Sequence, residues 1–208
     1  RIAARLPDVR VAEPVHAVTR NRAGRVIVAS RSGAEAFDAV VLACHSDESQ
    51  RLLADADADE RALLAAVRYQ PNRAVLHTDS ALMPTARKVW SAWNYLSDGA
   101  SAQARVSVTY WLNRLQPLPF TTPLFVSLNP LRAPGPRSVL AEFDYAHPVF
   151  DAAAIEAQRR LPALQGRRGV WFAGAWTGYG FHEDGLRSGL AVAAALRAKA
   201  AQTQRLAA

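Results

Sequence analysis

The sequence predicts a mixed α/β fold, because strand patterns and helix patterns alternate along the chain. Residues 11–43 show strand patterns separated by glycine turns, and residues 70–165 contain further short strands with prolines between them. Residues 170–196 form a short apolar run, a glycine-bearing loop and a long segment with apolar residues at helical spacing. Together these observations predict a strand–loop–helix unit joined to a second, mixed β-sheet.

The composition is typical of a globular protein, since half of the 208 residues are hydrophobic and 21% are charged. The formal net charge is +7, yet no Lys/Arg-rich run has the length of a nucleic-acid-binding arm, so we expect no nucleic-acid partner. A single cysteine, Cys44, excludes an intrachain disulfide and a cysteine metal cluster, and it fits a reducing cytoplasm. No apolar run is long enough to span a membrane.

The first part of the chain predicts strands at 15–19 and 25–29, followed by a continuous apolar run at 37–43. A continuous run is typical of a strand that is buried on both faces. Ser46 or Asp47 is then placed to cap a helix. The acidic segment that follows, 54–60, begins a second helix, and we expect it to be a solvated surface because it lacks the glycine and glutamate of a calcium loop.

The middle of the chain is rich in aromatic residues and in strand patterns. The strands are expected at residues 73–78, 89–95, 106–111, 124–128 and 138–145. Four aromatic residues in them are candidates for a substrate-facing wall: Trp93, Tyr95, Tyr110 and Trp111. Such a wall suits an amine, through cation–π contacts, or an acyl chain. The alternative is that these rings fill the core of the sheet. After this region, Asp151 is expected to cap a helix that begins at Ala152.

The stretch from Val170 to Leu196 is the most informative part of the sequence. A helix that begins after a glycine loop presents free backbone N–H groups and the positive end of its dipole, which suit an electron-rich group. Glycines at 185 and 189 remove side chains that would keep a flat ligand away. His182-Glu183-Asp184 lacks the spacing of a zinc site, so we expect no metal.

This stretch resembles the C-terminal flavin-binding segment of the FAD-dependent amine oxidase superfamily. Ala173-Gly174 match the strand end of that family, Ser188-Gly189 match its helix turn, and the string 178–189 is similar to a bacterial branch of NAD/FAD-binding or flavin-containing amine oxidase proteins. Two positions depart from the family pattern: Ala175 replaces a usual acidic residue, and Asp184 falls where the first helix glycine is usual. The resemblance implies part of an FAD/NAD(P)-binding fold with a β-meander.

The resemblance also implies FAD as cofactor and a set of residues near it. The residues implied are Val15, Gly174, Ala175, Gly178, Tyr179, Gly180, His182, Glu183, Asp184, Gly185, Ser188 and Gly189. For Val15 alone, a core valine in a plain meander is an equal alternative. The resemblance divides the chain into a meander segment (1–69), a substrate segment (70–165) and a flavin segment (166–208). No catalytic side chain is identified, because a flavin carries the chemistry itself.

The resemblance implies that the complete protein is an FAD-dependent oxidoreductase that takes hydride from a C–N or C–C bond of a small-molecule substrate. We expect the chain to be the C-terminal portion, because no Gly-x-Gly-x-x-Gly fingerprint of a Rossmann-like, dinucleotide-binding N-terminal half is found. Two alternatives stay open: an oxidase or desaturase of an acyl lipid, and a truncated fragment that binds no flavin by itself. Peripheral membrane contact and a homo-oligomer also stay open.

Overall fold

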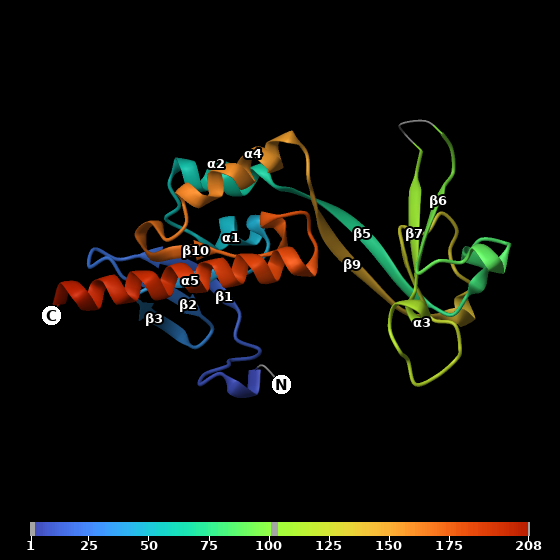
Figure 1. The fold of residues 1–208 in the computed structure, drawn as a ribbon, viewed down its shortest axis with the longest axis horizontal. Coiled ribbons are helices and arrows are strands. Elements are labelled where there is room, and N and C mark those ends of the chain that lie inside the picture. The colour runs from blue at the N-terminus through green and yellow to red at the C-terminus, as the bar shows by residue number, and fades with distance from the viewer. Residues whose placement is uncertain (1–2, 101–103, 208) are drawn as a thin grey trace. The chain divides into compact units, whose positions relative to one another are not determined.

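The computed structural model describes residues 3–100 and 104–207, and it divides the chain into two compact units. Unit 1 comprises Arg1–Tyr69 and Pro148–Ala208, and unit 2 comprises Gln70–His147. The chain leaves unit 1 in strand β5 (Arg68–His77) and returns in strand β9 (Val139–Val149) (Figure 1). Residues 148–165, which the sequence grouped with the middle segment, belong to unit 1. The predicted mixed α/β class is confirmed.

A three-stranded antiparallel meander forms one layer of unit 1. Its strands are β1 (Val15–Arg20), β2 (Val26–Ser30) and β3 (Gly33–Phe37), paired in that order. Gly24 has a φ of +78° in the turn between β1 and β2, a conformation that glycine adopts without a steric cost. An irregularity in the register between Val15 and Ala17 bends the start of β1.

Strands β4 (Val40–Leu42) and β10 (Val170–Phe172) form a second, parallel sheet of unit 1. The expectation of one strand over 37–43, buried on both faces, is wrong. The run divides between β3 and β4, and Val41 in the centre of β4 is 40% exposed. The reason is that β4 pairs only with β10 in this sheet, whereas a buried parallel strand has neighbours on both edges.

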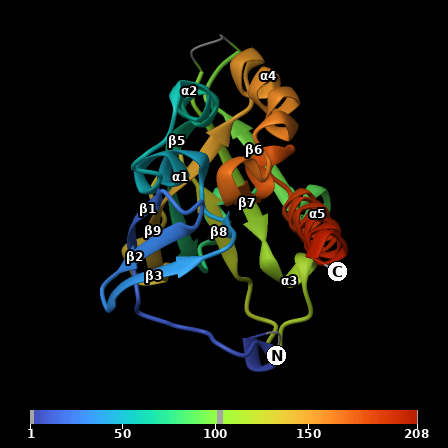
Figure 2. The same ribbon diagram turned by 90° about the vertical axis from the view of Figure 1, so that its left-hand side faces the viewer.

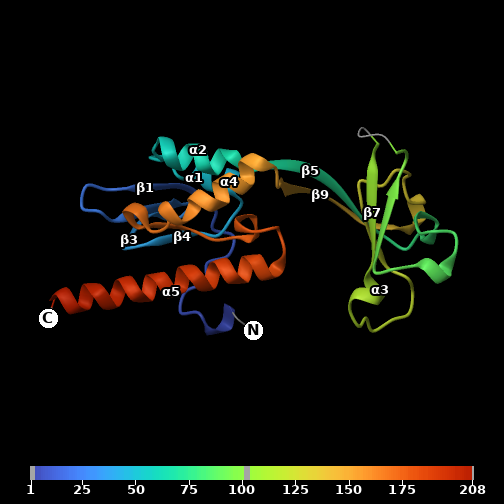
Figure 3. The same cartoon turned by 45° about the horizontal axis from the view of Figure 1, so that its top comes forward.

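Four helices complete unit 1. They are α1 (Ser46–Leu52), α2 (Ala58–Ala66), α4 (Ala152–Arg160) and α5 (His182–Ala207). Helices α2 and α4 lie side by side (Figure 3). Short 3₁₀ turns lie at Ala3–Arg5, Leu161–Ala163, Arg167–Gly169 and Ala175–Thr177 in this unit, and at Ser80–Leu82, Arg87–Val89 and Pro136–Ser138 in unit 2. None of the helices in the described part of the chain is both long and apolar enough to cross a membrane.

The two faces of β10 pack against different layers. Val170 and Phe172 join a core cluster with Val18 and Val26 of the meander. The alternate residues Trp171 and Ala173 pack with Val192 of helix α5 in a second cluster. The meander and α5 therefore pack against opposite faces of β10, and the period of two along a strand accounts for this division. Figure 2 shows the strands of the meander and helix α5 apart from each other within unit 1.

The helix caps agree with the sequence in part. Asp57 caps α2 by accepting backbone N–H bonds, and Asp151 caps α4 as predicted, with Oδ1 accepting from the Ala154 N–H at 2.9 Å. Helix α1 is capped differently, because His45 is its N-cap residue and the Glu48 side chain accepts from the His45 N–H at 3.0 Å. The expectation that Ser46 or Asp47 caps this helix is therefore wrong.

A buried ion pair lies where the sequence predicted a solvated acidic surface. Glu60 and Arg20 pair directly, with side chains that are 1% and 3% exposed. Asp55 adds a second carboxylate 2.9 Å from the Arg20 guanidinium. Removing one member of such a buried pair takes from the other charge its closest partner in the interior, which is strongly destabilising. The acidic segment is thus a structural link between strand β1 and helix α2.

Unit 2 is built around one five-stranded sheet with the order β6-β7-β8-β5-β9. The strands not yet given are β6 (Trp93–Ser97), β7 (Val106–Trp111) and β8 (Phe125–Leu128), and the short helix α3 (Leu112–Leu115) follows β7. The strand expected at 89–95 begins only at Trp93, because residues Arg87–Val89 form a 3₁₀ turn. The other expected strands of this region are present, with ends shifted by a few residues.

A buried polar chain crosses the sheet of unit 2. His77 Nδ1 accepts the Asp79 N–H at 3.1 Å, so a neutral ring carries its proton on Nε2, which lies 2.9 Å from Ser127 Oγ. Ser127 Oγ in turn lies 2.7 Å from Thr109 Oγ1. Burial lowers the pKa of His77 below its ordinary value of 6.5, although the nearby Asp79 carboxylate acts in the opposite direction.

We predict that Glu60→Gln lowers the free energy of unfolding by about 3 kcal/mol, because the buried Arg20 guanidinium loses its closest carboxylate. Urea denaturation followed by circular dichroism measures this loss. The control is Arg51→Gln, which removes the exposed Arg51–Asp47 pair and should cost less than about 0.5 kcal/mol. Equal effects of the two substitutions would contradict a structural role for the buried pair.

We predict that unit 2 loses stability on acidification because of His77. The folded state holds His77 neutral with a lowered pKa, so the unfolded state binds a proton more readily and the free energy of unfolding falls below pH about 6.5. Urea denaturation on both sides of that pH measures the slope. His77→Gln should remove this contribution, and His147→Gln, at an exposed histidine, should not. A slope that survives His77→Gln would show that another group causes it.

Candidate functional site

The junction between strand β10 and helix α5 is the candidate functional site. Gly174 ends the strand segment with a φ of +151°, and its N–H donates to Ser188 Oγ at 2.9 Å. Ser188 Oγ also lies 2.8 Å from the Gly185 carbonyl oxygen, to which it donates. The strand end is thus tied to the second turn of α5. Ligands of parallel sheets bind beyond the carboxyl ends of the strands, which is where this junction lies.

The two glycines of α5 differ in their surroundings. A side chain at Gly185 would lie 3.7 Å from the backbone nitrogen of Ala175, so this glycine packs against the junction itself. A side chain at Gly189 would have no neighbouring atom within 4 Å. Open space therefore lies beside Gly189, one turn along the helix from the junction, and nothing in the packing of the described residues requires a glycine there.

The amides of the glycine loop are partly occupied by the chain itself. The Asp184 carboxylate Oδ2 accepts the Tyr179 N–H and the Phe181 N–H, each at 3.0 Å. Phe181 is the residue before helix α5, so Asp184 neutralises the positive end of that helix from within. These two amides are not free for a ligand, which the sequence did not show. His182 and Glu183, in contrast, are exposed in the first helical turn.

Two side chains that the sequence analysis missed hold the loop in place. Trp176 is 2% exposed, lies directly beside Gly174, and donates from Nε1 to the Cys44 carbonyl oxygen at 3.2 Å. The indole thereby fills the space between the loop and the chain after β4. Gln158 of α4 donates from Nε2 to the carbonyl oxygens of Trp176 and Gly178, at 2.9 and 2.7 Å. No spacing in the sequence links Gln158 to a loop some twenty residues later.

The remaining loop residues of the predicted set are Ala175, Gly178, Tyr179 and Gly180, of which Tyr179 and Gly180 are exposed. Tyr179 is 66% exposed and contacts Phe150, with ring centroids 6.2 Å apart. Gly178 and Gly180 flank it, and Gly180 has a φ of +86°, which a side chain would strain. Ala175 begins the turn Ala175–Thr177. Their contact with a flavin stays a prediction.

Val15 lies in a separate part of unit 1, at the start of β1. It lines a cavity of about 270 Å³ together with Val28 and Phe37. Glu13 lies at the same cavity, and hydrogen bonds from Ser30 Oγ and the Ser32 N–H keep the pKa of its carboxyl below the usual value. The valine is therefore not simply a core residue, and the cavity is a place where a flat group could lie.

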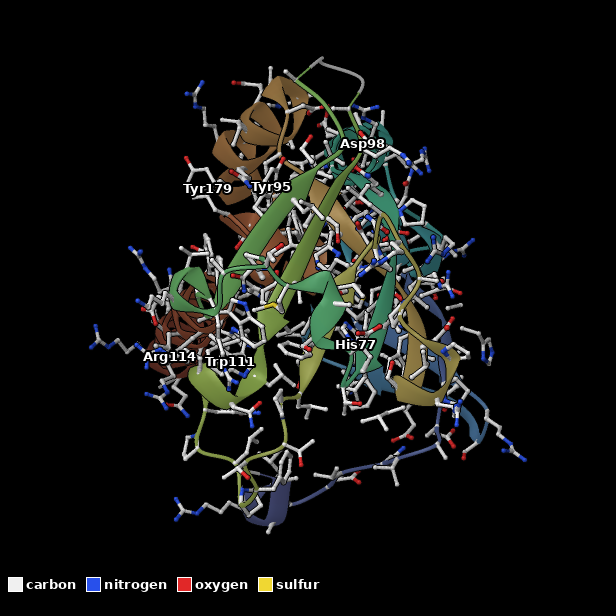
Figure 4. All side chains as sticks on the ribbon, turned by 90° about the vertical axis from the view of Figure 1, so that its right-hand side faces the viewer. His77, Tyr95, Asp98, Trp111, Arg114 and Tyr179 are labelled. Atoms are coloured by element: carbon white, nitrogen blue, oxygen red, sulfur yellow. The ribbon has the colours of Figure 1, made fainter. Side chains whose placement is uncertain are left out.

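The four aromatic residues of the predicted substrate wall do not share one face. Trp93 opposes Tyr110 in the register, with ring centroids 5.6 Å apart, and Tyr95 follows on the same face. Trp111 points to the other face, where it packs against Trp90 at 5.4 Å. Figure 4 shows Tyr95 and Trp111 at different levels of the hairpin. Trp93 and Tyr95 are 58% and 69% exposed, so these two rings do not fill the core of the sheet, whereas Trp111 packs against Trp90.

Among the residues that the structure describes, no group of three His, Cys, Asp or Glu side chains is close enough to hold a metal ion. The site is therefore defined by backbone geometry, glycines and aromatic rings.

Comparison with known proteins finds similarity in structure only. No protein-family model matches the sequence, and no curated protein matches it significantly. The fold is similar to that of a wild-type putrescine oxidase bound to putrescine, with a TM-score of 0.60 and 13% identity over 95% of this chain and 51% of that chain. It is also similar to a CLA-producing fatty acid isomerase from P. acnes, with a TM-score of 0.55 and 16% identity over 83% of this chain and 44% of that chain.

A cyclohexylamine oxidase from Brevibacterium oxydans IH-35A is similar at a TM-score of 0.50 and 14% identity, over 89% of this chain and 48% of that chain. The chain thus spans about half the length of the solved structures that it matches. The comparisons confirm the fold that the resemblance to the FAD-dependent amine oxidase superfamily implied.

Proposed function

We propose that the chain supplies the C-terminal flavin-facing and substrate-facing parts of an FAD-dependent oxidoreductase of the amine oxidase kind. The reaction takes hydride from a carbon of a C–N or C–C bond in a small-molecule substrate. The observation that carries this proposal is the open space beside Gly189, on the helix that is tied to the strand end through Ser188 and Gly174. A planar group that lies against a helix needs this combination of a fixed backbone and a missing side chain.

The residues that would hold the cofactor follow from this geometry. The turn at Gly174 and Ala175 and the face of α5 at Gly185 and Gly189 would contact the ring system, and the cavity at Val15 would take the far end of the cofactor. Bound there, FAD would supply the hydride-accepting ring. The chain's own residues would orient it and limit access of water. His182 and Glu183, exposed at the first turn, would lie at the edge of the site.

The parallel sheet of unit 1, β4 with β10, is exposed in part, which is an argument for a second polypeptide segment that covers it. All three residues of β10 are buried, whereas Val41 of β4 is 40% exposed. Leu186 and Leu190, two large apolar side chains four positions apart on helix α5, are 58% and 61% exposed. We propose that a dinucleotide-binding half covers these residues and adds strands beside β4. The free thiol of Cys44 fits a reducing, cytoplasmic setting.

A second candidate has its own supporting observation. Because Asp184 occupies two loop amides, a chain without the missing half has little left to attract an anionic cofactor, and it would bind no flavin by itself. The second candidate is therefore a non-catalytic fragment. The catalytic candidate leaves two substrate classes open, amines and acyl lipids. The matched proteins include both a putrescine oxidase and a fatty acid isomerase. The exposed rings of Trp93 and Tyr95 suit an amine or an acyl chain.

We predict that the complete gene product purifies with the visible absorbance of oxidised flavin, whereas residues 1–208 alone do not retain FAD. The reason is that the ADP part of FAD needs the glycine fingerprint that this sequence lacks. Absorbance spectra of both proteins after incubation with FAD and gel filtration provide the measurement. A complete gene product that stays colourless after reconstitution with FAD would contradict the oxidoreductase proposal.

We predict opposite effects of Gly189→Ala on stability and on flavin retention. Nothing lies near the new methyl group, and alanine favours a helix interior over glycine, so the free energy of unfolding of the chain should rise by about 0.5–1 kcal/mol. In the complete protein, flavin retention should fall, because the methyl group lies in the proposed site, and Gly189→Val should abolish it. Ala198→Val, on an exposed part of the same helix, is the control. Unchanged flavin content in both glycine variants would remove Gly189 from the site.

A further inference from the structure

Three loops meet at one end of the unit 2 sheet, which we call the loop end (residues 79–92, 112–124 and 132–138). The register places Trp111 opposite Phe125, and Phe125 opposite His77, so β7 ends where β8 begins and β5 ends. Strand β6 begins at this same end, because Trp93 opposes Tyr110. The segments that connect these strand ends therefore gather in one place.

Hydrogen bonds join two segments of the loop end, 79–92 and 132–138, to each other and join the first of them to the end of β7, which the segment 112–124 follows directly. Arg132 donates from Nη2 to the Ala81 carbonyl oxygen at 2.6 Å, and the Gly135 N–H donates to Asp79 Oδ2 at 2.9 Å. The Trp111 N–H donates to the Ala92 carbonyl oxygen at 2.9 Å, which joins the end of β7 to the segment before β6. The loop end is thus a defined surface and not three independent loops.

The loop end carries a strong excess of positive charge. Its cationic residues are Arg87, Lys88, Arg114, Arg132 and Arg137, and all five are exposed. None of these five belongs to an ion pair within the described residues. The one carboxylate here is Asp79, whose two oxygens accept the Ala81 and Gly135 N–H groups, each at 2.9 Å. Asp79 is the single negative charge of the loop end, and its interaction with Arg132 helps to lower the pKa of its carboxyl, so the five cations outnumber it.

The rest of unit 2 shows no such excess. Arg73 pairs with Glu142 at 2.7 Å and Arg105 pairs with Asp98 at 2.8 Å, both away from the loop end. Asp144 on β9 adds a further negative charge. The excess positive charge of this unit thus lies at one end of its sheet.

Exposed apolar side chains alternate with the cations at the loop end. Val89 is 60% exposed next to Lys88, Leu115 is 46% exposed next to Arg114, and Phe120 is 45% exposed in the loop that follows. Figure 4 shows Arg114 projecting from the short helix α3, near Trp111 at the end of β7. A surface with apolar side chains between cations matches the headgroup region of an anionic bilayer, where charge attracts the protein and apolar groups enter the interface.

We propose that the loop end docks on an anionic lipid bilayer, with the cations on the lipid phosphates and Val89, Leu115 and Phe120 inserted between headgroups. A second copy of this chain is a poor occupant, because two loop ends would repel each other. Nucleic acid is the less favoured occupant, because two of the three exposed apolar side chains, Val89 and Leu115, are aliphatic and only Phe120 offers a ring on which a base can stack. The proposal needs no flavin, so its outcome is independent of the oxidoreductase proposal.

The test is co-sedimentation of residues 1–208 with vesicles of phosphatidylserine and phosphatidylcholine in equal parts, compared with vesicles of phosphatidylcholine alone. We expect binding to the anionic vesicles that weakens as salt is added. The double variant Lys88→Glu/Arg114→Glu should bind about tenfold more weakly or worse, since each cation near an anionic surface contributes about a fivefold factor. Phe120→Ser should also weaken binding, without a change in charge.

The matched control is Arg197→Glu/Lys199→Glu on the exposed C-terminal part of helix α5, which changes the net charge by the same amount. It should keep the affinity of the wild type within about twofold. Equal losses in the two double variants would overturn the proposal in favour of a non-specific charge effect. Absence of binding to anionic vesicles would also overturn it, as would tighter binding to a single-stranded oligonucleotide that the loop-end variant abolishes.

Discussion

The parallel pairing of β4 with β10 is the constraint on which the rest of unit 1 depends. It joins residues that lie some 130 positions apart in the sequence, Val40 opposite Val170 and Leu42 opposite Phe172. Such a pairing cannot be made by a turn, and it is stable only where both faces are covered. The meander covers one face through Val18 and Val26, and helix α5 covers the other through Val192. The carboxyl ends of the two strands then define where the loop after Gly174 must lie.

The buried ion pair of Arg20 and Glu60 serves this same arrangement. It fixes the end of β1 to the first turn of α2, and Asp55 links the pair to the segment between the helices. A hydrophobic contact could hold these elements equally well, so the pair is weak evidence for added stability. The ion pair does disfavour other placements of strand β1, because Arg20 would then be buried without a carboxylate beside it.

The sequence predicted the elements well and their environments less well. Strands with turn residues between them, and the helix with Gly185 and Gly189, are local patterns, and they are present. Burial is not local: Val41 was expected inside and is exposed, whereas Glu60 was expected outside and is buried. The resemblance identified the β10–α5 junction, but it could not show that Asp184 bonds the amides of the loop. The bond from the Phe181 N–H has the three-residue spacing of a helix cap, whereas the bond from the Tyr179 N–H depends on the loop folding back, which no spacing encodes.

The charge and the exposed rings of unit 2 bear on the choice between an amine and an acyl lipid as the substrate. The cations of the loop end repel a cationic amine, and the one carboxylate there is held by backbone N–H groups. The exposed rings of Trp93 and Tyr95, on the strand that begins at this end, remain available for an apolar chain. An enzyme that docks on a bilayer through such an end meets its substrate in the lipid phase, where acyl chains are abundant and free amines are not. Within the oxidoreductase proposal, docking of the loop end therefore favours an acyl lipid as the substrate over an amine.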